Sequence, residues 1–145
     1  MTDSARSRLA CLAALLCVAL GGAADGDALV APSVDDQGRA RPSLTLRASP
    51  PFAFAPARIS FTGEIRGGPD DEEQLYCPAV VWDWGDDTTS ESQADCEPFE
   101  KGRSRIRRFY AIEHEFETEG RYLVRLKLLQ RNRPVLSASI EIVVN

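Results

Sequence analysis

The sequence predicts an all-β fold, an antiparallel β-sandwich of about seven strands over residues 43–145. Apolar and polar residues alternate with a period of two from Ser43 onward, short turn-rich stretches separate the alternating segments, and no helical period appears within them. Because alternation gives each strand one buried and one solvated face, two antiparallel sheets are expected to pack face to face. About 100 residues suit a sandwich of the immunoglobulin-like kind.

The first strands are expected at residues 43–49 and 58–65. "SLTLRAS" and "RISFTGEI" both alternate, and the second places Ile59, Phe61 and Ile65 on one face. The stretch 50–57, "PPFAFAPA", is expected to interrupt the sheet, since proline has no N–H for a ladder.

The remaining strands follow an acidic, turn-rich loop at residues 67–74. They are expected within "AVVWDWG", "FYAIEHEF", "RYLVRLKL" and "VLSASIEIVV", that is, at 79–85, 109–116, 121–128 and 135–144. "ETEG" reads as a turn and "QRNRP" as a hairpin connection.

The N-terminal residues have the pattern of a signal peptide. Arg6 and Arg8 precede an apolar run, Leu9–Leu20, and small residues follow it, which predicts a signal peptide over 1–24 with cleavage after Ala24. Residues 25–42 then form a flexible linker before the domain at 43–145. The expected location is extracellular or periplasmic, with no membrane insertion after cleavage. An uncleaved anchor is the alternative.

The charge balance argues against one class of partner. The net charge is −5, and a nucleic-acid-binding protein usually carries a basic face that neutralises phosphates. The basic stretch at residues 100–108 is expected to be a solvated loop and strand start in an otherwise acidic protein, with a patch for an anionic ligand as the alternative.

Cys77 and Cys96 are the two cysteines that remain after signal cleavage. In an oxidising compartment such a pair is most simply a disulfide. Closing this loop would contribute about 3 kcal/mol in the entropic model. A metal or redox pair has little support, because the chain has no CxxC and its single histidine is His114.

Trp82 and Trp84 are two residues apart, so on a strand they share a face with Val80. The apolar neighbours favour a core position, where large aromatic side chains stabilise most. A platform for stacking sugar rings is the alternative.

The acids around the tryptophans have two interpretations. Asp83 faces away from them, and Asp86 and Asp87 follow Gly85 in a turn, where short acids usually accept hydrogen bonds from nearby N–H groups. The alternative is calcium, with Asp86 and Asp87 joining Asp70 and Asp71 of the acidic loop, although the spacing does not match an EF-hand. No other cofactor is expected.

His114 is predicted to lie on an apolar face with Ile112 and Phe116. A lone histidine there is more often a hydrogen-bonded core residue than a ligand or base, and no catalytic triad spacing is visible. The sequence therefore predicts no enzyme and no catalytic residue.

These motifs resemble the PKD domain family, named for polycystic kidney disease protein repeats. The resemblance spans roughly 42–144 and rests on two motifs, "WDFGDG" and "H-x-Y" with "G-x-Y-x-V-x-L". The corresponding residues are Trp82, Asp83, Trp84, Gly85, Asp86, His114, Phe116, Gly120, Tyr122, Val124 and Leu126, with Trp84 in the Phe position and Phe116 in place of the usual Tyr.

The sequence also departs from the family pattern. Asp87 stands at the second glycine, residues 88–107 are longer than usual, and the pair Cys77 and Cys96 is an addition. The resemblance implies an immunoglobulin-like domain in which these motif residues are structural and Asp83 and Asp86 hold the turn.

The resemblance also implies a use outside cells, as a non-catalytic module for protein or polysaccharide binding or adhesion, including beside bacterial proteases. The alternatives are an accessory subunit of a surface assembly without its own ligand, and a calcium-stabilised module.

Overall fold

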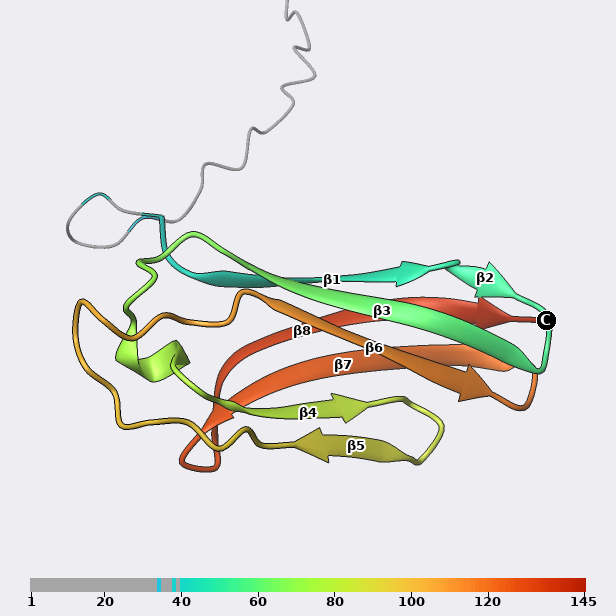
Figure 1. Ribbon diagram of the computed structural model, residues 1–145. Helices are drawn as coiled ribbons and strands as arrows, with labels where there is room; N and C mark the ends of the chain where they lie inside the picture. The colour runs from blue at the N-terminus through green and yellow to red at the C-terminus, as the bar shows by residue number, and fades with distance from the viewer. Residues whose placement is uncertain (1–33, 35–37, 39) are drawn as a thin grey trace, which may run out of the picture. The chain divides into compact units, whose positions relative to one another are not determined.

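The computed structural model describes residues 34, 38 and 40–145, so the predicted signal peptide and most of the predicted linker lie outside the described residues. The described part contains eight strands and one short 3-10 turn, η1 (Figure 1). Their bounds are β1 Ser43–Ser49, β2 Phe52–Ala53, β3 Ala57–Arg66, η1 Glu73–Leu75, β4 Ala79–Asp83, β5 Thr89–Ser92, β6 Phe109–Phe116, β7 Gly120–Gln130 and β8 Arg133–Val144.

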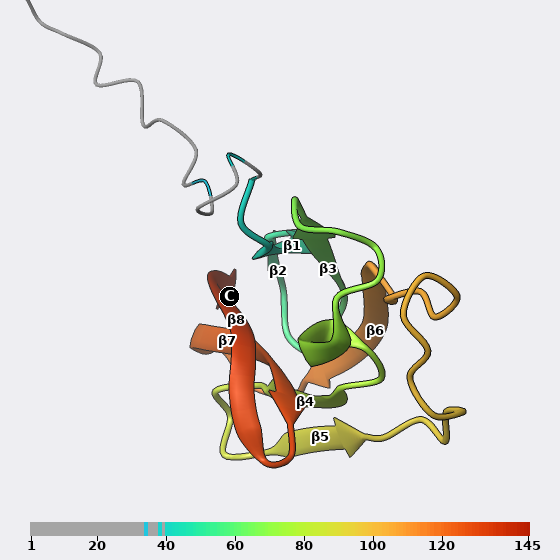
Figure 2. The ribbon, with the colours of Figure 1, turned by 90° about the vertical axis from the view of Figure 1, so that its left-hand side faces the viewer.

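The strands form two sheets, one in the order β1-β3-β6 and one in the order β2-β8-β7-β4-β5. The sheets lie one above the other when the sandwich is viewed along the strands (Figure 2). All pairings are antiparallel except that of β2 with β8, which is parallel. The predicted immunoglobulin-like β-sandwich is therefore confirmed.

Two short strands differ from the sequence prediction. β2 lies within residues 50–57, where the prolines predict an interruption of the sheet, and β5 lies within residues 88–107, the segment that is longer than in the family pattern. β2 forms despite its prolines because a proline can still accept a hydrogen bond, and the Val143 N–H donates to the Pro51 carbonyl at 3.3 Å. β5, "TSES", pairs with β4 because a tight turn after Asp83 folds it back.

The core follows the period of two in both sheets. The largest fully buried side chains come from β3 and β6 on one side and from β7, β8 and the β4–β5 turn on the other: Ile59, Phe61, Ile65, Phe116, Trp84, Val124, Leu126, Leu128, Ile142 and Val144. Gly63 of β3 lets the two sheets pack closely, since a Cβ at this position would overlap Cδ2 of Leu126 in the facing sheet. Within the described residues, no helix is long and apolar enough to cross a membrane.

Candidate functional site

Both tryptophans of the motif are buried. Trp82 is 3% exposed and Trp84 1%, and their rings stack 5.5 Å apart with an interplanar angle of 6°. Phe61 of the facing sheet packs against them, 5.4 Å from Trp84 and 6.4 Å from Trp82 between ring centroids. Rings in this position have no free face on which a sugar could stack.

His114 connects this core to the turn after β4. Its ring stacks on Trp84 at 4.2 Å with an angle of 3° and meets the Phe116 ring edge-on at 4.7 Å. Its Nε2 lies 2.8 Å from Oδ2 of Asp86. Trp84 itself is held by β5, because its Nε1 donates to the Ser90 hydroxyl at 3.0 Å. The histidine thus has both a packed ring and a polar partner.

Asp86 holds the turn that follows β4. Its Oδ1 accepts hydrogen bonds from the backbone N–H of Thr88 at 3.0 Å and from the Thr88 hydroxyl at 2.6 Å. Partial burial by itself would raise the pKa of Asp86, but the hydrogen bonds from Thr88 and His114 outweigh it and hold the pKa below its ordinary value of 3.8. The carboxylate therefore stays charged and tied to the turn.

Asp83 does not share this role. Its Oδ2 lies 3.5 Å from both Arg125 Nη1 and Lys127 Nζ, on the outer face of the five-stranded sheet. The expectation that Asp83 and Asp86 together hold the turn applies to Asp86 alone, because the pleat of β4 directs Asp83 away from the core.

Two residues of this turn have left-handed backbone conformations. Gly85 has φ +76°, and a Cβ there would lie 2.9 Å from the backbone N and O of Leu123. Asp87 has φ +66°, so the position where the resembled family has its second glycine keeps a glycine-like conformation. The departure at Asp87 changes the side chain more than it changes the backbone.

The acidic loop before β4 contains a separate network. Asp70 accepts from Arg108 Nε at 2.7 Å, and Arg108 also donates to the carbonyls of Ile65, Gly67 and Gly68 at 3.0–3.2 Å. Arg108 of the basic stretch therefore fixes this loop instead of remaining solvated.

The calcium candidates are not brought together. The loop with Asp70 and Asp71 precedes β4, the turn with Asp86 and Asp87 follows it, and the two lie at opposite ends of the strand (Figure 1). Across residues 40–145, no three His, Cys, Asp or Glu side chains gather in a way that could hold a metal ion.

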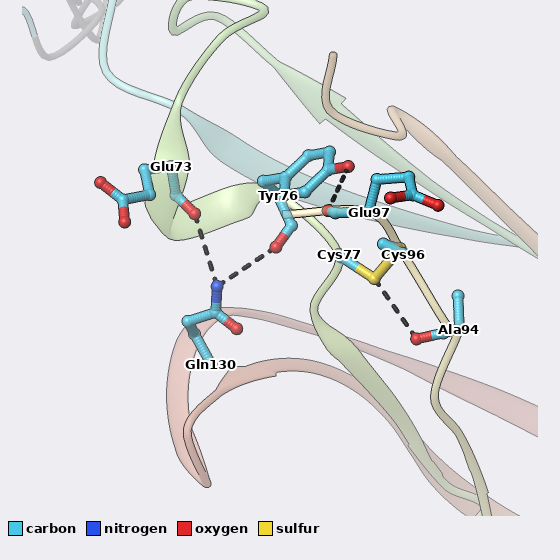
Figure 3. Close-up of a disulfide and its surroundings, with 7 residues drawn as sticks. All are labelled: Glu73, Tyr76, Cys77, Ala94, Cys96, Glu97 and Gln130. Carbon is cyan, nitrogen blue, oxygen red and sulfur yellow. Dashed lines mark hydrogen bonds between the residues drawn. A yellow bond between two sulfur atoms is a disulfide. The ribbon is translucent and has the colours of Figure 1, made fainter. Parts of the chain in front are cut away.

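Cys77 and Cys96 form a disulfide with a Cα–Cα distance of 6.3 Å (Figure 3). Cys77 precedes β4 and Cys96 follows β5, so the bond closes the open end of the β4–β5 hairpin. Around it, the Tyr76 hydroxyl donates to the Glu97 carbonyl at 3.0 Å, and Gln130 Nε2 donates to the Tyr76 carbonyl at 3.2 Å. The segment after β5 is thereby held against the start of β4.

Two exposed aromatic side chains lie at the edge of the five-stranded sheet. Phe52 is 63% exposed and Phe54 76%, and we call this pair the edge phenylalanines. They alternate with Ala53 and Ala55, which pack against the core. The alternation "FAFA" is a sequence signal for this surface, but the neighbouring prolines predict an interruption of the sheet instead.

The backbone of this edge is fixed by β8. The Asn145 N–H donates to the Ala53 carbonyl at 2.8 Å, and the Ala55 N–H donates to the Asn145 carbonyl at 2.9 Å. In a parallel ladder alternate residues point toward the partner strand, so the backbone groups of Phe52 and Phe54 point toward the free edge of the sheet.

The solved structures similar to this chain include two domains of archaeal proteins. One is the PKD domain of an M14-like peptidase from a Thermoplasmatales archaeon, at 14% identity and a TM-score of 0.48, covering 72% of this chain and 96% of that one. The other is a CARDB domain from Pyrococcus furiosus, solved in complex with di-metal ions, at 8% identity and a TM-score of 0.41, covering 72% and 92%.

The first of these belongs to the family that the motif residues resemble. No family model matches the chain, and no curated protein matches it.

Proposed function

We propose that this protein is an exported, non-catalytic PKD-like module that binds a protein or polysaccharide partner through its edge phenylalanines. The observation that carries the proposal is the exposure of Phe52 and Phe54 side by side on a free sheet edge. Such a surface is what a binding module needs, whereas an accessory subunit without a ligand of its own would not need it.

The free-energy cost of exposing two phenylalanines to water supports a binding role for this edge. Burying a phenylalanine is worth about 1.5–3 kcal/mol, so leaving two of them in water forgoes a substantial stabilisation. Sheet edges are usually protected by charged residues or prolines, and aromatic residues are enriched in the cores of interfaces. Pro50, Pro51 and Pro56 flank the edge phenylalanines and limit the open edge to a few residues.

Two further features fit the proposal. The disulfide suits an oxidising compartment, as does the expected signal peptide. His114 and Asp86 are committed to each other and to the Trp84 stack, which supports a structural use of these titratable residues.

Photo-cross-linking in the producing cells tests the proposal. A benzophenone amino acid at position 54 should give a discrete adduct with one protein or polysaccharide, identified by mass spectrometry or by glycosidase digestion. The matched control is position 109, since Phe109 is 60% exposed and starts β6 of the other sheet.

Wild-type protein added in excess before irradiation should suppress formation of the adduct, whereas the double variant Phe52→Ser/Phe54→Ser should not, although it should melt near the wild-type temperature. Indistinguishable adducts from positions 54 and 109, or none from position 54, would refute the proposed function.

A further inference from the structure

A cavity of about 300 Å³ opens on the side of the sandwich where β5 and β6 form the edges of their sheets. The connection from β5 to β6 runs along this side (Figure 2). The cavity is lined by the disulfide and by Tyr76, Pro78, Val80 and Tyr110, with Arg105 and Arg107 also contributing. Ligand sites in proteins measure about 300–1,000 Å³, so this cavity is at the small end of the range and suits a group the size of one amino acid.

The Tyr110 hydroxyl has no hydrogen-bond partner within the described residues. Tyr110 is 2% exposed, and its oxygen is the buried side-chain atom left unsatisfied there. Burial raises the pKa of the phenol above its usual 10.0, with Arg107 acting more weakly in the opposite direction, so the group remains a proton donor. Buried hydroxyls in native proteins are nearly always paired, so this one points to an acceptor supplied from outside the chain.

Two arginine side chains line the same cavity as Tyr110. Arg107 sits over the Tyr110 ring, 5.0 Å from its centroid, and its Nε donates to the Phe109 carbonyl, which leaves its terminal N–H groups for another acceptor. Arg105 Nη1 is 3.7 Å from Asp70, whose closer partner is Arg108 at 2.6 Å. An exposed pair at that distance contributes little and gives way easily to a better one.

Most of the remaining wall is apolar. Pro78, Val80, Ala94 and the disulfide offer carbon and sulfur surface, Ser92 and Gln93 add neutral polar groups, and no lining residue carries a carboxylate. An occupant that suits this lining combines an apolar body with a negatively charged acceptor. A carboxylate is the natural form of that acceptor, because a guanidinium binds it with two parallel hydrogen bonds.

We propose that this cavity binds a carboxylate carried on a short apolar stem, held by Arg107 and Tyr110 with help from Arg105. Such a group is presented either by a small free carboxylic acid or by the C-terminal residue of a polypeptide. The site is separate from the edge phenylalanines and does not depend on them.

Titration of the ¹⁵N-labelled protein by NMR tests the site. N-acetylvaline should shift the backbone amides of Ser92–Ala94 and 105–110 saturably, with a dissociation constant in the millimolar range or below, and N-acetylvalinamide, which lacks the charge, should bind about tenfold more weakly. Adding N-acetyl-Ala-Ala-Val separates the two sources. Tighter binding of this peptide identifies a polypeptide terminus, and tighter binding of N-acetylvaline identifies a free acid.

Matched tyrosine variants separate binding from folding. Tyr110→Phe should weaken N-acetylvaline binding about tenfold without lowering the melting temperature, because it removes an unsatisfied hydroxyl. Tyr122→Phe should lower the melting temperature and leave N-acetylvaline binding unchanged, since the Tyr122 hydroxyl donates to the Thr118 carbonyl at 2.7 Å. Arg107→Gln should abolish the preference for the acid over the amide.

Three results would overturn the inference: no saturable shift at these amides, equal binding of acid and amide, or unchanged affinity in Tyr110→Phe. Wild-type binding is expected in Phe52→Ser/Phe54→Ser, so a failure of this site and a failure of the proposed function are distinguishable.

Discussion

Replacing Gly85 with alanine tests whether the turn after β4 is pressed against β7. A left-handed alanine costs about 1–2 kcal/mol, and the stiffer unfolded chain returns about 0.4–1 kcal/mol. The new Cβ would also lie 2.9 Å from the Leu123 backbone nitrogen and oxygen. Backbone atoms in a central strand cannot swing aside as a side chain would, and relieving such overpacking costs about 1–3 kcal/mol. The sum is a loss of roughly 1–5 kcal/mol, centred near 3 kcal/mol.

Asp87→Ala is the matched control, because Asp87 is also left-handed, at φ +66°, and lies in the same turn. It is already a non-glycine residue and it is exposed, so this change should cost less than about 1 kcal/mol, reflecting the better tolerance of aspartate for this conformation. Urea unfolding followed by tryptophan fluorescence would measure both variants. If Gly85→Ala costs no more than Asp87→Ala, the contact with Leu123 is not rigid and the argument fails.

Two further predictions concern the disulfide and the loss of stability at low pH. Cys77→Ser/Cys96→Ser should lower the free energy of unfolding by about 3 kcal/mol, as should reduction of the wild type, and a loss of under about 0.5 kcal/mol would show that the β4–β5 hairpin already imposes the constraint. Because the pKa of Asp86 is lowered in the folded state, its stabilisation is complete above its ordinary pKa of 3.8 and is lost as pH falls through the lower folded value. Asp86→Asn should therefore be less stable than wild type at pH 7 and approach it once the pH lies below the folded pKa of Asp86. A gap in urea midpoint that stays constant with pH would contradict this assignment.

Strand positions could be predicted where alternation is strong. β3 and β7 bury every second residue along nearly their whole length, so the period of two fixed both their existence and their inward faces. β5 gives no such signal, because "TSES" is polar throughout and pairs only through the turn that precedes it. β2 was missed for a different reason, since two residues carry too little pattern to outweigh the adjacent prolines.

The candidate sites depend on contacts between distant residues, which a single sequence does not encode locally. The face of Tyr110 could be predicted from its strand, but its unsatisfied hydroxyl and its neighbour Arg107 required the folded arrangement. The bond between Asp70 and Arg108 joins residues 38 apart, and nothing in either segment indicates the other. For the same reason, the distance between the two acidic segments that could have held calcium became visible only in the structure.

The parallel pairing of β2 with β8 has a mechanical consequence. The described chain enters the sandwich near residue 40 at one end and leaves at Asn145 at the other, so tension between these points runs along the strands (Figure 1). The bonds that join Pro51, Ala53 and Ala55 to the last residues of the chain lie across that direction and are loaded in shear. Bonds loaded in shear must break together, whereas bonds loaded perpendicular to the strands break one at a time. A domain under flow or traction would thus resist extension at the edge that carries Phe52 and Phe54.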